Sequence, residues 1–230
     1  MPGLLVTGTD TGVGKSILTA ALVAALRSHG VDVAALKPVA TGLVEPQQSI
    51  WPPDHELLAG AAGCLPEDVV AATYGPAVSP HLAAELAGIP LDVAAVLERI
   101  EAAACAHEVL VVEGVGGLLV PLRGAYDIKR LAQDAGLPLL IAARAGLGTI
   151  NHTLLTLESA RHAGLEVVAV VLTPWPATPG VIERSNRETI ERLGEVDVWT
   201  LPEVAHPGPD ALAAAGATLP LARWIGAAVR

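Results

Sequence analysis

Phenylalanine is absent from this chain of 230 residues, which also has only two cysteines and one methionine. The apolar core must therefore be built largely from alanine, valine, leucine and isoleucine. Cys64 and Cys105 form no C-x-x-C pair, which argues against a disulfide framework or a cysteine-built zinc site and is typical of a reduced compartment. We expect a cytoplasmic protein.

Basic residues are scarce, with 14 Lys and Arg against 24 Asp and Glu and a net charge of −10. This balance, without a Lys/Arg cluster, argues against nucleic acid or an anionic membrane surface as a partner. No apolar run approaches the roughly 18–20 residues of a membrane-spanning helix. The N-terminal residues 1–4 have no basic region, so we expect no secretion signal.

Short apolar runs alternate with longer amphipathic ones, which predicts an α/β fold with a parallel sheet covered by helices on both faces. We expect one domain over residues 1–230. Strands are predicted at residues 4–7, 33–37, 109–113, 139–143, 167–172 and 198–201. Helices are predicted at residues 15–28, 53–62, 80–87, 92–106, 127–135, 151–163, 181–193 and 210–229.

Residues 8–16 read Gly-Thr-Asp-Thr-Gly-Val-Gly-Lys-Ser and stand between a predicted strand and a predicted helix. This order is the context of a P-loop, although Thr9 occupies the position of the usual first glycine. Glycines let backbone N–H groups face phosphate oxygens, and the helix N-terminus adds a positive dipole. Lys15 would reach the β- and γ-phosphates, and the Ser16 hydroxyl would bind Mg²⁺. The chain is thus predicted to have a P-loop NTPase-like fold.

Three further charged residues stand near predicted strand ends. Lys37 ends a strand before Pro38, so it would point into the phosphate crevice or extend its ammonium into water. Glu113 follows a buried strand, where it would be a Mg²⁺ ligand or a water-facing carboxylate. Asp54 is by local sequence a helix cap, and one carboxylate can both cap and bind metal.

A second glycine-containing turn, residues 146–152, leads into another predicted helix. Its free N–H groups would form an anion seat suited to a carboxylate. The alternative is a helix start capped by Thr149 or Asn151.

Together these segments resemble the dethiobiotin synthase family, through residues 8–16, 37–42, 54, 79–81, 112–121 and 146–152. The resemblance implies a homodimeric ligase of biotin biosynthesis that needs ATP and Mg²⁺. It would convert 7,8-diaminopelargonic acid and CO₂ to dethiobiotin through a carbamate and a carbamic–phosphoric anhydride. ADP and phosphate would be the other products.

The resemblance also implies site residues, by their match to the family's motifs. The catalytic residues would be Thr11, Lys15 and Lys37, and the Mg²⁺ ligands Ser16, Asp54 and Glu113. Substrate contacts would come from Thr11, Lys37 and Thr41, and, across the homodimer, from Gly148, Thr149, Ile150 and Asn151. Nucleotide contacts would come from Gly12, Val13, Gly14, Lys15, Ser16, Ile17, Asp54, Glu113, Gly114, Val115 and Gly116, with Thr173, Pro174, Pro202, Glu203 and Val204 on the side of the base.

The chain departs from the family pattern at two positions. Gly12 stands where some members have an acidic residue. Thr173 and Pro174 stand where many members place an asparagine that contacts the purine, so we expect other nucleoside triphosphates to replace ATP.

Two other classes fit the pattern less well. A partner-regulated partition ATPase has a second lysine at the position of Asp10. An amidotransferase of the cobyrinate type carries a glutaminase domain, which we do not expect within 230 residues.

Overall fold

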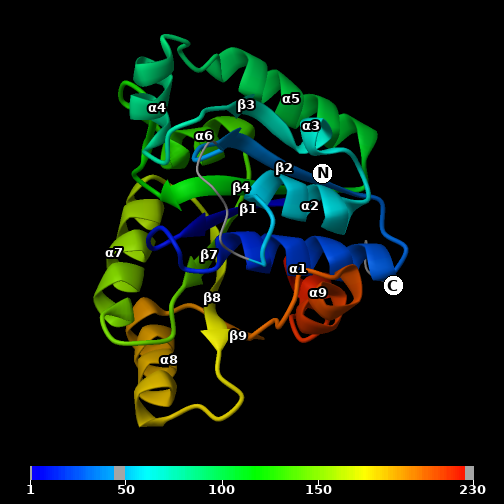
Figure 1. The fold of residues 1–230 in the computed structure, drawn as a ribbon. Coiled ribbons are helices and arrows are strands. Elements are labelled where there is room, and N and C mark those ends of the chain that lie inside the picture. Colours follow the sequence, from blue (N-terminus) through cyan, green and yellow to red (C-terminus); the bar gives the residue numbers. More distant parts are fainter. Residues whose placement is uncertain (1, 44–49, 226–230) are drawn as a thin grey trace.

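A seven-stranded parallel sheet forms the centre of the computed structural model, which describes residues 2–43 and 50–225. The strand order is β3-β2-β4-β1-β7-β8-β9 (Figure 1). The predicted parallel sheet is confirmed. Its central strands β4, β1 and β7 are largely apolar because both of their faces are covered, and Thr7 and Glu113 are the buried polar residues within them. The strands are β1 (Gly3–Gly8), β2 (Val33–Ala40), β3 (Val70–Thr73), β4 (Val109–Gly117), β7 (Leu139–Ala143), β8 (Val167–Trp175) and β9 (Val198–Pro202).

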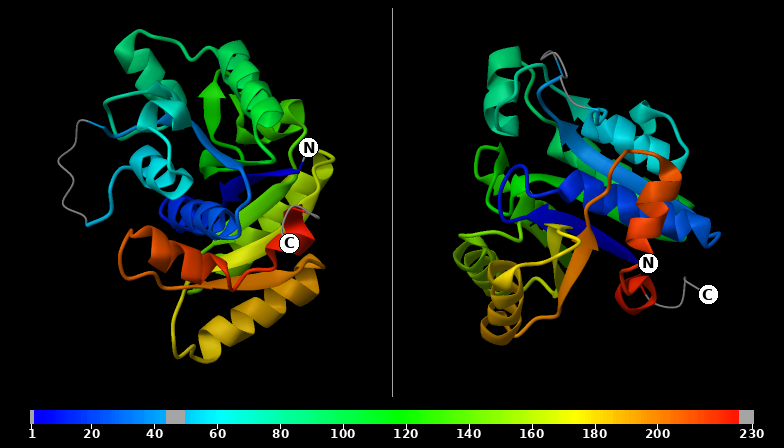
Figure 2. Two further views of the ribbon diagram at one scale, coloured as in Figure 1. Left: turned by 90° about the vertical axis from the view of Figure 1, so that its right-hand side faces the viewer. Right: turned by 60° about the horizontal axis from the view of Figure 1, so that its bottom comes forward.

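Helices cover both faces of the sheet, as the two views of Figure 2 show. One face packs against α1 (Lys15–Ser28), α2 (Asp54–Ala62), α9 (Pro209–Gly216) and α10 (Leu221–Ile225). The opposite face packs against α4 (Pro80–Ala87), α5 (Val93–Ala106), α6 (Ile128–Ala135), α7 (Thr149–His162) and α8 (Val181–Gly194).

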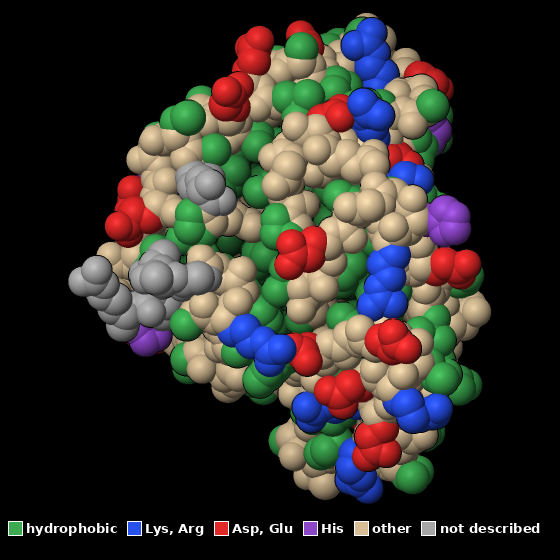
Figure 3. Space-filling view, turned by 180° about the vertical axis from the view of Figure 1, so that it is seen from behind, with side chains coloured by type: hydrophobic (Ala, Val, Ile, Leu, Met, Phe, Trp, Pro, Cys, Tyr) green, Lys and Arg blue, Asp and Glu red, His purple; other side chains and the backbone are tan. Residues whose placement is uncertain are grey.

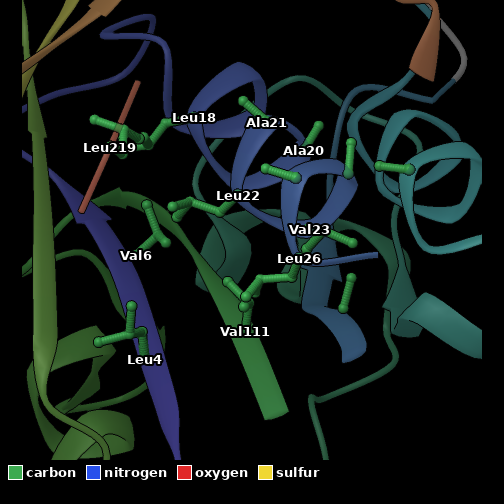
Figure 4. Close-up of a cluster of buried hydrophobic side chains, with 14 of the residues drawn as sticks. Leu4, Val6, Leu18, Ala20, Ala21, Leu22, Val23, Leu26, Val111 and Leu219 are labelled. Atoms are coloured by element: carbon green, nitrogen blue, oxygen red, sulfur yellow. The ribbon is translucent and has the colours of Figure 1, made fainter. Parts of the chain in front are cut away.

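Helix α1 is the most deeply buried of these helices. Its residues from Leu18 to Leu26 are almost completely inaccessible, because the sheet lies on one side and α2 and α9 lie on the other. Figure 4 shows Leu18, Leu22 and Leu26 among side chains of β1 and β4. This packing fixes the end of the P-loop, which leads directly into α1.

The predicted helix at residues 210–229 is wrong. Helix α9 ends at Gly216, and α10 begins at Leu221; residues 226–229 lie outside the described residues. Pro220 between them has no N–H, and a proline disfavours helical geometry in the residue before it.

Short elements were not predicted. They are the edge strand β3, the one-turn helix α3 (Pro66–Val69), and a hairpin of β5 (Pro121–Arg123) and β6 (Tyr126–Asp127). Each is shorter than five residues, so periodicity carries little information about it.

The topology places the carboxyl ends of β2, β4 and β1 side by side. Leu36 of β2 pairs with Val112 of β4, so the next residues along, Lys37 and Glu113, lie at the same level. Glu113 is itself in register with Val6 of β1, two residues before the P-loop begins. Ligands of open parallel sheets bind at this edge.

The surface carries charges of both signs. On the face shown in Figure 3, lysine and arginine side chains are interspersed with aspartate and glutamate. Within residues 2–43 and 50–225, none of the helices is both long and apolar enough to cross a membrane.

Candidate active site

The loop between β1 and α1 has the strand–loop–helix context that a P-loop requires. Gly12 and Gly14 adopt positive φ angles of 70° and 88°, which favour glycine. The N–H of Thr9 donates to the carbonyl of Ala142 in β7 at 3.0 Å, which ties the loop to the sheet. Lys15 is buried, and its Nζ donates to the carbonyl of Asp10 at 2.9 Å. This lysine is therefore directed into the loop rather than into solvent.

A cluster of charged groups lies beside the loop. Lys37 is only 5% exposed, and its Nζ donates to Glu113 Oε1 at 2.6 Å and also to Asp54 Oδ2. The Ser16 hydroxyl donates to the same Glu113 oxygen at 2.8 Å. The structure thus brings together the P-loop serine, the second lysine and both predicted metal-binding carboxylates.

Three interpretations of these side chains are wrong. Lys37 and Glu113 are buried, so neither extends into water as the alternatives held. Asp54 does not cap α2, because Pro53 occupies the cap position and the Asp54 side chain pairs with Lys37 instead. A fixed ammonium is a stronger partner for a carboxylate than a backbone N–H.

Burial and the charges of the cluster shift the pKa values of three groups. Burial lowers the pKa of Lys15, because the charged ammonium loses solvent. Burial acts in the same direction on Lys37, but the carboxylates of Glu113 and Asp54 outweigh it and raise the pKa of Lys37. For Asp54, the attraction of Lys37 outweighs burial and lowers the pKa of the carboxyl. Lys37 is therefore cationic and Asp54 anionic at neutral pH.

The donors of the cluster fit Mg²⁺. Two carboxylates and a hydroxyl are oxygen ligands of the kind this cation prefers, and phosphate and water oxygens usually complete its coordination. Glu113 Oε2 is buried and has no hydrogen-bond partner among the described residues, so one carboxylate oxygen is available. Ser16, Asp54 and Glu113 could hold the cation together.

A cavity of about 690 Å³ opens over this cluster. Its polar side includes Thr11, Lys15, Lys37 and Thr41, and predicted nucleotide contacts Gly12, Gly14, Ser16, Ile17, Asp54, Val115 and Gly116 also line it. Val13 and Gly114 are buried beside it rather than lining it.

The cavity is also lined by residues to which sequence reasoning gave no role. Trp51, Leu57, Val78 and Val120 form apolar surface there, next to Ser79 and Pro80 at the start of α4. Of these, Ser79, Pro80 and Val120 carried a signal, because they fall in segments that resemble the family. The others come from loops and helices that only the fold brings near the P-loop.

The two segments predicted to face the base lie side by side. Strand β8 continues to Trp175, which pairs with Pro202 of β9 and accepts a hydrogen bond from the N–H of Glu203 at 3.3 Å. Thr173 is buried against the P-loop, since a β-carbon added at Gly14 would lie 3.0 Å from its Cγ2. Thr173, Pro174, Pro202, Glu203 and Val204 do not line the large cavity.

The second glycine turn lies apart from the cavity. Helix α7 begins at Thr149, two residues earlier than predicted, and Gly148 is its cap residue with a φ of 91°. No side chain caps this helix, so the alternative with Thr149 or Asn151 as a cap is wrong. Neither these residues nor Ile150 line the cavity that contains Lys15.

The strand order, the P-loop and the buried lysine beside it define a P-loop nucleoside triphosphatase fold with an enzyme-like cavity. Solved structures agree with this class. A ParA family ATPase from Chlorobium tepidum has a TM-score of 0.56 at 13% identity, covering 99% of this chain and 97% of that chain. The cell division ATPase MinD of Pyrococcus furiosus has a TM-score of 0.56 at 18% identity, covering 95% and 98%. At these identities the likeness shows the fold alone.

Sequence relatives define the family more narrowly. A family model described as an AAA domain matches residues 2–204. Proteins named ATP-dependent dethiobiotin synthetase BioD are 44% identical in Anaeromyxobacter sp. (strain K), over 84% of this chain and 90% of that protein, and 37% identical in Haloferax mediterranei, over 94% and 90%. The chain belongs to the family of ATP-dependent dethiobiotin synthetases, the ligase family predicted from its sequence.

Proposed function

We propose that this chain closes the ureido ring of dethiobiotin from 7,8-diaminopelargonic acid, CO₂ and ATP, with Mg²⁺ as cofactor. The observation that carries the proposal is the buried Lys37 beside the P-loop lysine in one cavity. A nucleotide-hydrolysing switch needs cations at the phosphates. A ligase also needs groups that bind the acceptor next to the γ-phosphate. Lys37, Thr11 and Thr41 line the same cavity as Lys15, which supports this role for them.

The reaction divides into three steps whose atoms balance. One amine of the substrate adds to CO₂ and loses a proton, which gives a carbamate. A carbamate oxygen attacks the γ-phosphorus, and the bond to the β-phosphate oxygen breaks to release ADP. The second amine then attacks the carbonyl carbon of the carbamic–phosphoric anhydride and loses a proton, and phosphate leaves as the ring closes.

In this scheme Lys15 binds the β- and γ-phosphates, and Lys37 faces the carbamate oxygen that attacks. Both ammonium groups oppose the negative charge that develops on the transferring phosphoryl group. Thr11 and Thr41 orient the substrate amines. Ser16, Asp54 and Glu113 would hold Mg²⁺, which supplies further charge neutralisation at the phosphate oxygens.

We place the binding of the distal carboxylate on Gly148, Thr149, Ile150 and Asn151 of a second subunit. Two observations support a shared site: this turn does not line the cavity of its own subunit, and the adjacent Leu147 is 89% exposed. The N–H groups at the start of α7 suit a carboxylate. We also keep a cytoplasmic location in the proposal, which the free thiols of Cys64 and Cys105 support.

The test is ADP release from Mg-ATP and bicarbonate with and without the diamine, together with mass detection of dethiobiotin. We expect ADP to form in proportion to dethiobiotin and only when the diamine is present. A monoamine analogue that lacks the second amine controls for simple carbamate phosphorylation, because it cannot close a ring. Equal ADP release without the diamine would refute the proposal and indicate a switch ATPase.

A further inference from the structure

Arg144 is the first residue after β7, and no role has yet been given to it. Its Nη2 donates to Asp10 Oδ2 at 3.1 Å, an ion pair between the β7–α7 loop and the P-loop. The partners are separated by 134 positions in the sequence. Both side chains are about half exposed, so the pair itself contributes little to folding stability. Because Asp10 belongs to the P-loop, the ion pair suggests a role in that loop rather than in folding stability.

Asp10 controls the orientation of one peptide group of the P-loop. Its Oδ1 accepts the N–H of Thr11 at 2.7 Å, and its carbonyl accepts the ammonium of Lys15 at 2.9 Å. That N–H and that carbonyl belong to the same trans peptide group, in which they point in opposite directions. When the carboxylate holds the N–H, the carbonyl must face Lys15. The Asp10 carboxylate therefore fixes where the P-loop ammonium rests.

The charge of Asp10 is unfavourable in a loop that binds phosphate. Like charges repel, so an unpaired carboxylate here would weaken the binding of a triphosphate. Arg144 offsets this charge, because its guanidinium pairs with Oδ2 and leaves Oδ1 bonded to Thr11. The loop thereby retains the hydrogen bond that orients the peptide without a net negative charge.

Hydrogen bonds hold the backbone on both sides of Arg144. The preceding strand β7 binds the P-loop through the Thr9 N–H and the Ala142 carbonyl at 3.0 Å. Beyond Arg144, the buried Asn186 of α8 donates its Nδ2 to the carbonyls of Ala145 and Gly146 at 2.9 and 3.1 Å. The backbone before and after Arg144 is thus held in place, and the fold positions the Arg144 side chain next to Asp10.

We propose that Arg144 is a positioning residue for phosphoryl transfer: through Asp10 it orients the 10–11 peptide and with it Lys15 and Thr11. It does not contact the nucleotide itself. The inference rests on the proposed function for the reaction it serves, but its effect on nucleotide binding can be measured separately.

The test compares Arg144→Gln, Asp10→Asn and the double variant by equilibrium binding of Mg-ADP and by kcat and KM for ATP. We expect Arg144→Gln to weaken Mg-ADP binding and kcat/KM for ATP by about tenfold, within the range of coupled neighbouring residues. Arg144→Lys should recover most of this loss, because it keeps the charge. Thermal unfolding should be unchanged in all of these variants. Arg130→Gln is the matched control, since Arg130 forms an ion pair with Asp134 within α6, outside the P-loop and the cavity lining.

The double variant separates an indirect from a direct role. If Arg144 acts through Asp10, Arg144→Gln should change Mg-ADP binding less than about twofold once Asp10 is Asn. An equal loss in both backgrounds would mean that Arg144 contacts the nucleotide, and would overturn the proposal. Wild-type binding by Arg144→Gln would overturn it too. If the wild-type chain binds Mg-ADP but forms no dethiobiotin, the proposed function fails while the binding comparison still decides the role of Arg144.

Discussion

Among individual residues, Lys37 stands out because its ammonium is buried between two carboxylates. The predicted strand end and the following proline left two positions open for the Lys37 ammonium, the phosphate crevice or water. In the structure β2 continues to Ala40, and Lys37 is buried and lines the cavity. Its pairing with Glu113 and Asp54 could not be predicted, because it depends on β2 lying next to β4. For the same reason local sequence favoured Asp54 as a helix cap.

Lys37→Ala should reduce kcat by about 100-fold or more, because it removes a cation placed against developing charge. Mg-ADP should still bind, since Lys15 and the P-loop remain. The variant leaves the buried carboxylate of Glu113 without its ammonium, so we also expect a loss of about 3 kcal/mol in the free energy of unfolding. Steady-state kinetics, ADP titration and urea unfolding measure the three effects.

Lys129→Ala is the control, since Lys129 lies at the surface on α6 near Asp127. Lys37→Arg keeps the positive charge but changes the shape of the side chain, so it separates the effects of charge and shape. Turnover at the wild-type rate by Lys37→Ala would contradict the catalytic role.

The base-side residues predict weak selectivity among nucleoside triphosphates. Thr173 packs against Gly14, and Pro174 has no N–H, so neither offers the two-point contact of an asparagine amide. A site without base-specific hydrogen bonds rejects other bases weakly. We expect GTP, CTP or UTP to give kcat/KM within about tenfold of ATP, roughly 1.4 kcal/mol.

Comparison of kcat/KM for the four triphosphates measures this selectivity. Thr173→Asn tests the origin of the effect, because restoring the amide should raise the preference for ATP. A hundredfold preference for ATP in the unaltered chain would show that backbone groups near residues 202–204 read the base.

At the scale of elements, the crossing of α1 and α9 has the closest packing. A β-carbon added at Gly216 of α9 would lie 2.1 Å from the carbonyl oxygen of Ala21 in α1. Gly216→Ala must therefore push the helices apart, and we expect it to lower the free energy of unfolding by about 2 kcal/mol or more.

Gly60→Ala is the matched substitution in α2, where the added carbon meets nothing within 4 Å. It should raise the free energy of unfolding by about 0.5–1 kcal/mol, because alanine favours the helix over glycine. Urea unfolding of both variants compares them directly. An equal gain for the two would mean that helix propensity, not the crossing, determines the effect.

Long elements could be predicted from the sequence, and short or interrupted ones could not. The buried strands and the helix after the P-loop carried clear apolar patterns, and the predicted range of α1 matches the structure. The C-terminal helix was predicted as one piece because its alanine-rich composition outweighed Pro220 in the pattern. Strand β3 alternates between partly buried and exposed residues and lies at the sheet edge, where its pairing with β2 defines it.

For the whole molecule, the proposed shared site predicts complementation between two damaged chains. A Lys37→Ala chain retains its Gly148–Asn151 turn, whereas a chain with Asn151→Ala and Gly148→Pro retains its lysine. In a mixed two-fold dimer, one site would receive both damaged parts and the other would receive neither.

We expect mixing the two chains, after unfolding and refolding together, to restore up to about half of the wild-type activity per mixed dimer. Each chain refolded alone is the control. Mixed dimers that form but remain inactive would show that each site takes its carboxylate seat from its own chain. The sequence could not settle this arrangement by itself, because strand order and the separation of the turn from the cavity are properties of the fold.

The burial of α1 has a consequence for the dynamics of the molecule. Amide hydrogens exchange with solvent only when their hydrogen bonds open, and those enclosed by packed elements on all sides open last. The amides from Leu18 to Leu26 should therefore exchange with deuterium only through global unfolding, more slowly than those of α8 at the edge of the sheet. Mg-ADP should protect the amides of residues 8–14 by direct contact, while those of α1 slow only by the overall gain in stability. The amide exchange of the phosphate-binding loop would then respond to the nucleotide, whereas the helix that follows the loop would exchange last.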